Sequence, residues 1–190
     1  MILTNNEILD FLDKNYENEF ELIKLVPIKK NKNILEQGRS NKFIYILKEG
    51  IVKCSIMEEN NKSYTLEFLG VGEIIGEIET ILKCKNLASV KTLTDCLLYK
   101  IEINYFIKNL ISDPKFNILL ITELARRLQK TATRASSQQL NTLQISLKNL
   151  INLLEKQNVK FKKTDLAEYL GITTRSLNRE LKSINYRKII

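Results

Sequence analysis

The stretch KKTDLAEYLGITTRSLNRELK, from Lys162 to Lys182, has the spacing of a helix-turn-helix. The apolar residues of its two expected helices repeat at helical spacing: Leu166, Ala167 and Leu170 in the first, Leu177 and Leu181 in the second. Gly171 is expected to end the first helix, because glycine adopts left-handed backbone angles without strain. Thr173 is a suitable N-cap for the second helix.

The second helix would present a polar and basic face, and the N-terminal residues of such a helix reach base edges in a DNA groove. Arg175 and Arg179 lie one turn apart and can each bind guanine O6 and N7, whereas Asn178 suits adenine. Short hydroxyls at helix starts, here Ser176 and Thr164, are expected to contact phosphates. The expected DNA contacts are Lys163, Thr164, Thr174, Arg175, Ser176, Asn178, Arg179 and Lys182. The alternative is an amphipathic hairpin whose charged face is merely solvated.

The positive charge of the chain is concentrated in its C-terminal part. The net charge is +8, with 30 Lys and Arg against 22 Asp and Glu. Residues 1–113 carry 15 basic and 17 acidic side chains, whereas residues 114–190 carry 15 and 5, a net charge of +10. This bias favours a partner that carries phosphates. A basic helix on a membrane surface is the alternative, and the narrow apolar face without Trp or Phe disfavours it.

Composition excludes several classes of function. The chain contains no histidine, which removes Ser-His-Asp and Cys-His catalysis, most zinc sites and cupin-type metal enzymes, so we expect no enzymatic activity. Its cysteines, Cys54, Cys84 and Cys96, are widely spaced, a pattern of reduced thiols without a metal. The sequence has neither an apolar run near about 18 residues nor a basic-apolar leader, which predicts a cytoplasmic protein outside membranes.

The first 113 residues have the pattern of a small antiparallel barrel or jelly roll. Five of the six glycines fall between Gly38 and Gly76. Short segments rich in β-branched and aromatic residues recur at roughly ten-residue spacing: 42–47, 51–57, 63–69, 89–93 and 96–101. One or two helices are expected within Asn5 to Leu25, before the roll, and another at Ile103 to Ile111, closing it.

From Pro114 onward the spacing of apolar residues changes to that of a dimer helix. Residues separated by three or four positions form an a/d seam: Ile118, Ile121, Ala125, Leu128, Ala132 and Ala135. We expect this seam to pair two chains, with packing inside one chain as the alternative. Leu120 and Leu124 lie off the seam and could pack onto the roll.

The sequence therefore predicts an α+β fold in three parts. Residues 1–113 form the β-roll, 114–139 the dimerisation helix and hinge, and 140–190 the helix-turn-helix domain. The seam ends at Gln139, the polar stretch Ser136 to Thr142 is interpreted as the hinge, and a further amphipathic helix begins at Leu143.

Three segments in this order resemble the superfamily of the cyclic-AMP receptor protein and the fumarate-nitrate regulator. They are GVGEIIGEIE at 70–79, ELARRLQKTA at 123–132 and TDLAEYLGITTRSLNRELK at 164–182. The resemblance covers essentially the whole chain. It implies a homodimeric transcription factor with a cyclic-nucleotide-binding-like sensor domain, a dimerisation helix and a winged helix-turn-helix. Such a factor binds a pseudo-palindromic site in double-stranded DNA, and RNA polymerase is a candidate partner.

The resemblance also marks a candidate effector pocket, made of Gly76, Glu77, Leu87, Ala88, Ser89 and Thr131. In nucleotide-binding members an Arg-Ser-Ala run follows the Gly-Glu pair by ten residues, and its arginine neutralises the phosphate while the glutamate holds the ribose hydroxyl. Leu87 stands at the arginine position and cannot supply a fork of donors. Ala132, beside Thr131, replaces an expected second hydroxyl. These departures disfavour a cyclic nucleotide and leave Glu77 as a structural carboxylate near a turn.

Other effectors of the family are disfavoured as well. An iron-sulfur cluster needs about four clustered cysteines, and a haem sensor needs a histidine ligand. A different small-molecule effector stays open. The alternative function is a small-molecule-binding β-roll whose C-terminal helices bind a protein partner.

The C-terminus also departs from the family, in which a two-stranded wing follows the recognition helix. This sequence ends at Asn185 to Ile190, about where a first wing strand would begin. We expect a helix-turn-helix that lacks its wing, whether by truncation or by nature, with weaker and more salt-sensitive DNA binding. An exposed apolar edge is expected at Leu181, Ile184, Ile189 and Ile190.

Overall fold

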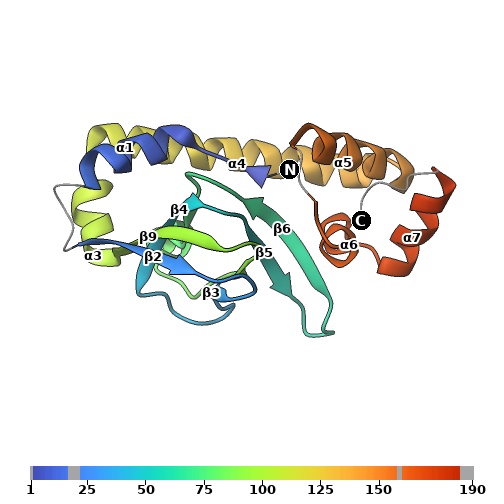
Figure 1. The fold of residues 1–190 in the computed structure, drawn as a ribbon, viewed down its shortest axis with the longest axis horizontal. Coiled ribbons are helices and arrows are strands. Elements are labelled where there is room, and N and C mark those ends of the chain that lie inside the picture. Colours follow the sequence, from blue (N-terminus) through green and yellow to red (C-terminus); the bar gives the residue numbers. More distant parts are fainter. Residues whose placement is uncertain (1, 17–21, 158–159, 185–190) are drawn as a thin grey trace.

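A computed structural model describes residues 2–16, 22–157 and 160–184 of the chain. The long helix α4 (Pro114–Leu140) runs along the molecule, with the β-roll and helix α1 (Asn6–Tyr16) beside its first half (Figure 1). Three shorter helices gather at its other end: α5 (Leu143–Gln157), α6 (Lys163–Leu170) and α7 (Thr174–Ser183). The architecture is the α+β arrangement that the sequence predicts, a β-roll followed by helices.

The roll consists of two sheets. The first has the order β1-β6-β5-β8-β3, with bounds Ile2–Leu3, Ser63–Leu69, Val52–Met57, Ser89–Thr92 and Asn33–Leu35. The second has the order β2-β9-β4-β7, with bounds Ile23–Ile28, Cys96–Glu102, Phe43–Glu49 and Ile74–Ile75. The short β1 pairs in parallel with β6, so the first sheet is mixed. The other pairings among the described strands are antiparallel, as expected.

The core of the roll is closed by helices rather than by the sheets alone. Ile8 and Leu12 of α1 and Phe116 of α4 are fully buried against strand residues such as Tyr99. The Phe116 ring packs on Phe11, with ring centroids 5.4 Å apart. Leu120 and Leu124, which lie off the dimer seam in the sequence, join the same cluster. The expectation that these two residues pack onto the roll is therefore confirmed.

Two segments differ from the sequence expectations. The helix before the roll ends at Tyr16, and Ile23 already starts strand β2, so the expected helical segment through Leu25 is wrong at its C-terminal end. Ile23–Leu25 pairs with β9 in the second sheet, and this tertiary pairing outweighs the local pattern. The expected helix at Ile103 to Ile111 is present and differs only in type, because a short α3 (Ile103–Tyr105) continues into a π-helical stretch, Phe106–Leu110.

The start of helix α2 and the end of helix α4 concern two sequence predictions, the Gly76-Glu77 pair and the hinge. Helix α2 (Glu77–Leu82) follows the tight turn at Gly76. Helix α4 continues through Ser136 to Leu140, and its connection to α5 is the residue pair Asn141 and Thr142. The polar stretch interpreted as a hinge is thus helical over most of its length, and only its last two residues break the helix.

Gly72 lies at a close approach between the N-terminal segment and the roll. Its φ of +80° lies in the left-handed region, and a Cβ there would lie 1.7 Å from the carbonyl oxygen of Asn5. Gly38 has a similar φ of +77°, but a Cβ at Gly38 would meet nothing within 4 Å. The two glycines therefore share a backbone conformation and differ in their surroundings.

This pair separates backbone strain from steric clash. We expect Gly38→Ala to lower the free energy of unfolding by about 1 kcal/mol, because a side chain disfavours positive φ. Gly72→Ala should cost a further 1–3 kcal/mol, roughly the cost of overpacking, because Asn5 must move. Urea unfolding of both variants tests this, and equal losses would contradict the close approach.

Candidate DNA-binding face and effector sites

The C-terminal helix pair has the geometry expected of a helix-turn-helix. Gly171 ends α6 with a φ of +68°. The Thr173 hydroxyl caps α7 by accepting a hydrogen bond from the backbone N–H of Ser176 at 3.1 Å. Leu166, Leu177 and Leu181 are buried between the helices. The cap, the turn glycine and the buried stripe are all confirmed.

The polar face of α7 is open to solvent. Residues of this face line one hollow on the surface: Thr174, Arg175, Asn178, Arg179 and Lys182. Arg175, Arg179 and Lys182 are exposed, and Arg179 makes a surface contact of 3.2 Å from Nε to Glu180. An exposed ion pair of this kind contributes little, so the guanidinium is available to another partner.

The expected phosphate contacts lie at the starts of the two helices. Thr164 is exposed and Lys163 is half-buried in the first turn of α6. Ser176 is half-buried, and its hydroxyl lies 3.0 Å from that of Thr173, so it belongs to the cap of α7. Of the expected apolar edge, Leu181 is buried and Ile184 packs against the same cluster, which corrects the prediction for these two residues. Ile189 and Ile190 lie outside the described residues.

The helix pair docks on the first sheet through an interface that the sequence did not reveal. Phe68 of β6 is fully buried against Phe161, with ring centroids 4.4 Å apart, and Tyr169 lies on its other side at 5.6 Å. Lys53 of β5 donates to Asp165 at 2.7 Å and to Glu168 at 2.9 Å. The two α6 carboxylates therefore hold the first helix of the motif on the roll.

Arg134 strengthens this contact from the side of α4. Its guanidinium lies over the rings of Tyr64 and Tyr169, 5.5 and 4.9 Å from their centroids, and donates to the carbonyl oxygen of Leu66. Gln138, one turn further along, accepts from the Tyr64 hydroxyl at 3.1 Å and donates to the Tyr169 carbonyl at 3.3 Å. These contacts join α4, β6 and α6 at one place.

Glu77 of the Gly76-Glu77 pair in the candidate effector pocket is bonded to another side chain of the same chain. Gly76 has a φ of +92°, which sets the turn into α2. Glu77 accepts a hydrogen bond from Arg127 Nη1 at 2.5 Å. Arg127 also donates through Nε and Nη2 to Glu73, at 3.0 and 2.5 Å, and its Nε lies 3.4 Å from Glu123. Arg127 of α4 thus contacts the carboxyl groups of three glutamates.

This cluster is buried and acidic. The side chains of Arg127 and Glu73 are 11% and 1% exposed. Burial raises the pKa of Glu73 to about 7, in spite of the opposing charge of Arg127. Burial also raises the pKa of Glu77. Oε1 of Glu73 and Oε1 of Glu123 have no hydrogen-bond partner among the described residues. Three carboxyl groups therefore surround one buried guanidinium.

The remaining residues of the candidate pocket do not assemble a phosphate site. The Leu87 side chain is mostly exposed, Ala88 is buried, and the Ser89 hydroxyl accepts from the Gln37 N–H at 3.0 Å. Thr131 donates to Glu67 at 3.5 Å. A leucine thus stands at the position of the family's arginine, and Glu77 is bonded to Arg127.

The buried acidic cluster predicts a pH dependence of stability. Glu73 binds protons more tightly in the folded state, so the contribution of Glu73 to stability is full below about pH 4.5 and is lost as the pH rises through about 7. We expect Glu73→Gln to flatten this decline by about 1–3 kcal/mol, because roughly 1.4 kcal/mol corresponds to each pKa unit.

Chemical denaturation across this pH range measures the effect. Glu58→Gln, at an exposed position, is the matched control and should keep the slope of the wild type. A Glu73→Gln variant that keeps the same slope would show that Glu73 titrates normally.

The seam residues of α4 are exposed in the single chain. Ile118, Ile121 and Leu128 are 61%, 56% and 72% exposed, and Ala125, Ala132 and Ala135 are exposed as well. The same helix buries Phe116, Leu120 and Glu123 toward the roll. An apolar stripe is therefore left uncovered along the opposite side of α4.

Other sites are limited in the part of the chain that the structure describes. No group of three His, Cys, Asp or Glu side chains there could hold a metal ion, and the three cysteines are free. Among the same residues, no helix is long and apolar enough to cross a membrane.

Comparisons with known proteins agree with this architecture. Residues 25–113 match the cyclic nucleotide-binding domain family. The cAMP-activated global transcriptional regulator CRP of Haemophilus influenzae is 23% identical over 170 residues, covering 83% of this chain and 75% of the relative.

Solved structures share the fold. The c-di-GMP-responsive global regulator CLP of Xanthomonas campestris superposes with a TM-score of 0.79 at 18% identity, covering 91% of each chain. A CRP/FNR-family transcriptional regulator from Thermus thermophilus superposes with a TM-score of 0.73 at 17% identity, covering 85% of this chain and 86% of its own.

Proposed function

We propose that the chain is a transcription regulator of the CRP/FNR type, a homodimer that binds double-stranded DNA sequence-specifically through α7. The observation that carries the proposal is the open face of Thr174, Arg175, Asn178, Arg179 and Lys182 at a capped helix start. These side chains are free to enter a major groove, where arginine and asparagine read guanine and adenine.

The charge distribution supports the same partner. Residues 114–190 carry a net charge of +10, while Asp165 and Glu168 of α6 both form ion pairs with Lys53 of the roll. The acidic groups nearest the motif are thus paired within the chain. Lys163 and Thr164 then face phosphates with less local repulsion.

The uncovered stripe of α4 supports the dimer. Its large members Ile118, Ile121 and Leu128 are exposed in one chain, and an apolar seam of this spacing is buried when two helices pair. Two recognition helices related by a twofold axis would meet successive major grooves about 34 Å apart. The proposed site is therefore a pseudo-palindrome with half-sites one helical turn apart.

The proposal excludes a cyclic nucleotide, haem or an iron-sulfur cluster as the controlling group. Leu87 stands where a phosphate would need donors, and Glu77 is bonded to Arg127. The proposal includes the cytoplasm as the location, because the protein needs access to DNA. RNA polymerase is the partner through which such a regulator would act.

One substitution distinguishes base reading from phosphate binding. We expect Arg179→Ala to lower affinity for the selected duplex by about 1–3 kcal/mol and to relax preference at one base pair. Lys163→Ala should instead weaken binding to all duplexes and reduce the salt slope by about 1.

Selection of bound duplexes from a random pool, followed by fluorescence anisotropy at several salt concentrations, measures both effects. Equal loss on all duplexes for Arg179→Ala would make Arg179 a phosphate contact. Wild-type protein without salt-dependent duplex binding would overturn the proposal and favour the alternative, a β-roll module whose C-terminal helices bind a protein.

The dimer is tested on the seam itself. Leu128→Lys places a charge on the exposed stripe and should convert the dimer to monomer and abolish tight operator binding, because a charge buried in the seam is unpaired. Leu140→Lys, at an exposed leucine outside the seam, should remain dimeric. Analytical ultracentrifugation gives the masses, and a dimeric Leu128→Lys protein would contradict this seam.

A further inference from the structure

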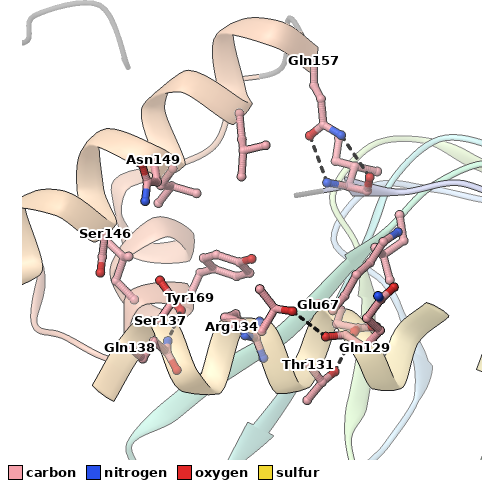
Figure 2. Close-up of a pocket in the computed structure, with 17 residues that line it drawn as sticks. Glu67, Gln129, Thr131, Arg134, Ser137, Gln138, Ser146, Asn149, Gln157 and Tyr169 are labelled. Carbon is pink, nitrogen blue, oxygen red and sulfur yellow. Dashed lines mark hydrogen bonds between the residues drawn. The ribbon is translucent and has the colours of Figure 1, made fainter. Parts of the chain in front are cut away.

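A cavity of about 520 Å³ lies where the roll, the long helix and the DNA-binding helices meet (Figure 2). Helix α4 contributes one wall, with Gln129, Thr131 and Arg134, and α5 contributes another, with Ser146 and Asn149. At one end Gln157 closes it by a pair of 3.0 Å hydrogen bonds to the backbone N–H and carbonyl of Ile2. This volume falls within the range of about 300–1,000 Å³ that is typical of sites for small molecules.

The cavity is separate from the candidate pocket at Gly76 and Glu77. Thr131 is shared, whereas the other residues of that pocket do not line the cavity. Arg127, Glu73 and Glu77 bind one another outside the lining of the cavity. The cavity also lies off the dimer seam, because none of the six seam residues is among its lining.

The chemistry of the lining is specific. Leu150, Leu153 and Leu170 supply an apolar floor. Hydroxyl and amide groups surround it, on Thr131, Thr133, Ser137, Ser146, Gln129, Gln138, Asn149 and Gln157. Lys130 and Arg134 are the cations of the lining, and Glu67 is the one acidic residue among the described residues there.

The lining of the cavity carries more positive than negative charge. Burial raises the pKa of Glu67, while Arg127, Arg134 and Lys130 oppose that rise. With Arg127 already held by Glu73 and Glu77, Lys130 and Arg134 together exceed Glu67 by one positive charge. A ligand with an anionic group would neutralise this excess positive charge, and an apolar part of the same ligand would pack against the leucines.

We propose that this cavity is the effector site and that it binds a small amphipathic organic anion, with its acidic group toward Lys130 and Arg134. The regulatory part of this inference rests on the proposed function. A molecule bound here contacts β6, α4, α5 and α6 at once. Because Arg134 and Gln138 also hold Tyr169 of α6, the ligand would stabilise the docked arrangement of the helix-turn-helix and thereby change DNA affinity.

The test uses anilinonaphthalene sulfonate, a fluorescent amphipathic anion, on the full chain. We expect saturable binding of one molecule per chain, lost in Ser146→Trp because the indole fills the cavity. Lys130→Gln should weaken binding about threefold to tenfold, as for a partly exposed ion pair. Leu153→Gln should weaken it through loss of apolar contact.

Matched controls lie on the same kinds of surface. Lys115→Gln, an exposed lysine of α4, and Leu82→Gln, an exposed leucine of α2, line no part of the cavity and should bind as the wild type does. Naphthylmethylammonium, an amphipathic cation, should bind at least about tenfold more weakly, because it meets like charge. Unchanged dye binding in Ser146→Trp, or equal binding of the cation, would overturn the assignment.

Duplex binding separates this inference from the proposed function. Saturating dye should change the affinity of the wild type for its selected duplex and leave that of Ser146→Trp unchanged. No change in the wild type would overturn the regulatory role. A chain that binds the dye as described but binds no duplex would overturn the proposed function and leave the ligand site standing.

Discussion

The Arg127 guanidinium, buried between the long helix and the roll, is the interaction on which the rest of the arrangement depends. It joins Glu73 and Glu77 of the roll to Glu123 of its own helix, and Glu123 in turn accepts a 2.7 Å hydrogen bond from Asn5 before α1. Removing one partner from such a buried network typically costs about 3–5 kcal/mol, because the other charges stay desolvated. The contact therefore fixes how α4 is rotated about its axis.

That rotation decides what the two faces of α4 can do. With Arg127, Leu120 and Phe116 turned toward the roll, helical geometry turns Ile121, Leu128 and Ala132 away from it. The stripe that would pair two chains is exposed for this reason. The same rotation carries Arg134 and Gln138 to Tyr64 and Tyr169, where α6 docks on the roll. The buried Arg127 guanidinium thus sets the orientation of both the exposed apolar stripe of α4 and the side chains that α4 contributes to the cavity.

Much of the fold could be predicted from the sequence because its signals are local. Glycine spacing and β-branched runs indicated the strands at 52–57, 63–69 and 96–102. The helix-turn-helix followed from Gly171, Thr173 and the leucine spacing, since caps and turns depend on neighbours in the chain. The short strands β1 and β7 carried too few residues for a periodic signal, and Ile23–Leu25 became a strand through its pairing with β9.

The sequence by itself determined the chemistry of the polar face of α7, the absence of histidine chemistry and the lack of an arginine at Leu87, because these depend on residue type and on spacing within one helix or loop. Tertiary structure alone decided which charges meet. Arg127 and Glu77 are 50 residues apart, and Lys53 and Asp165 are 112 apart, so no local pattern could pair them. The cavity is of the same kind, since its walls come from β6, α4, α5 and α6 and exist only where the folded chain brings these together.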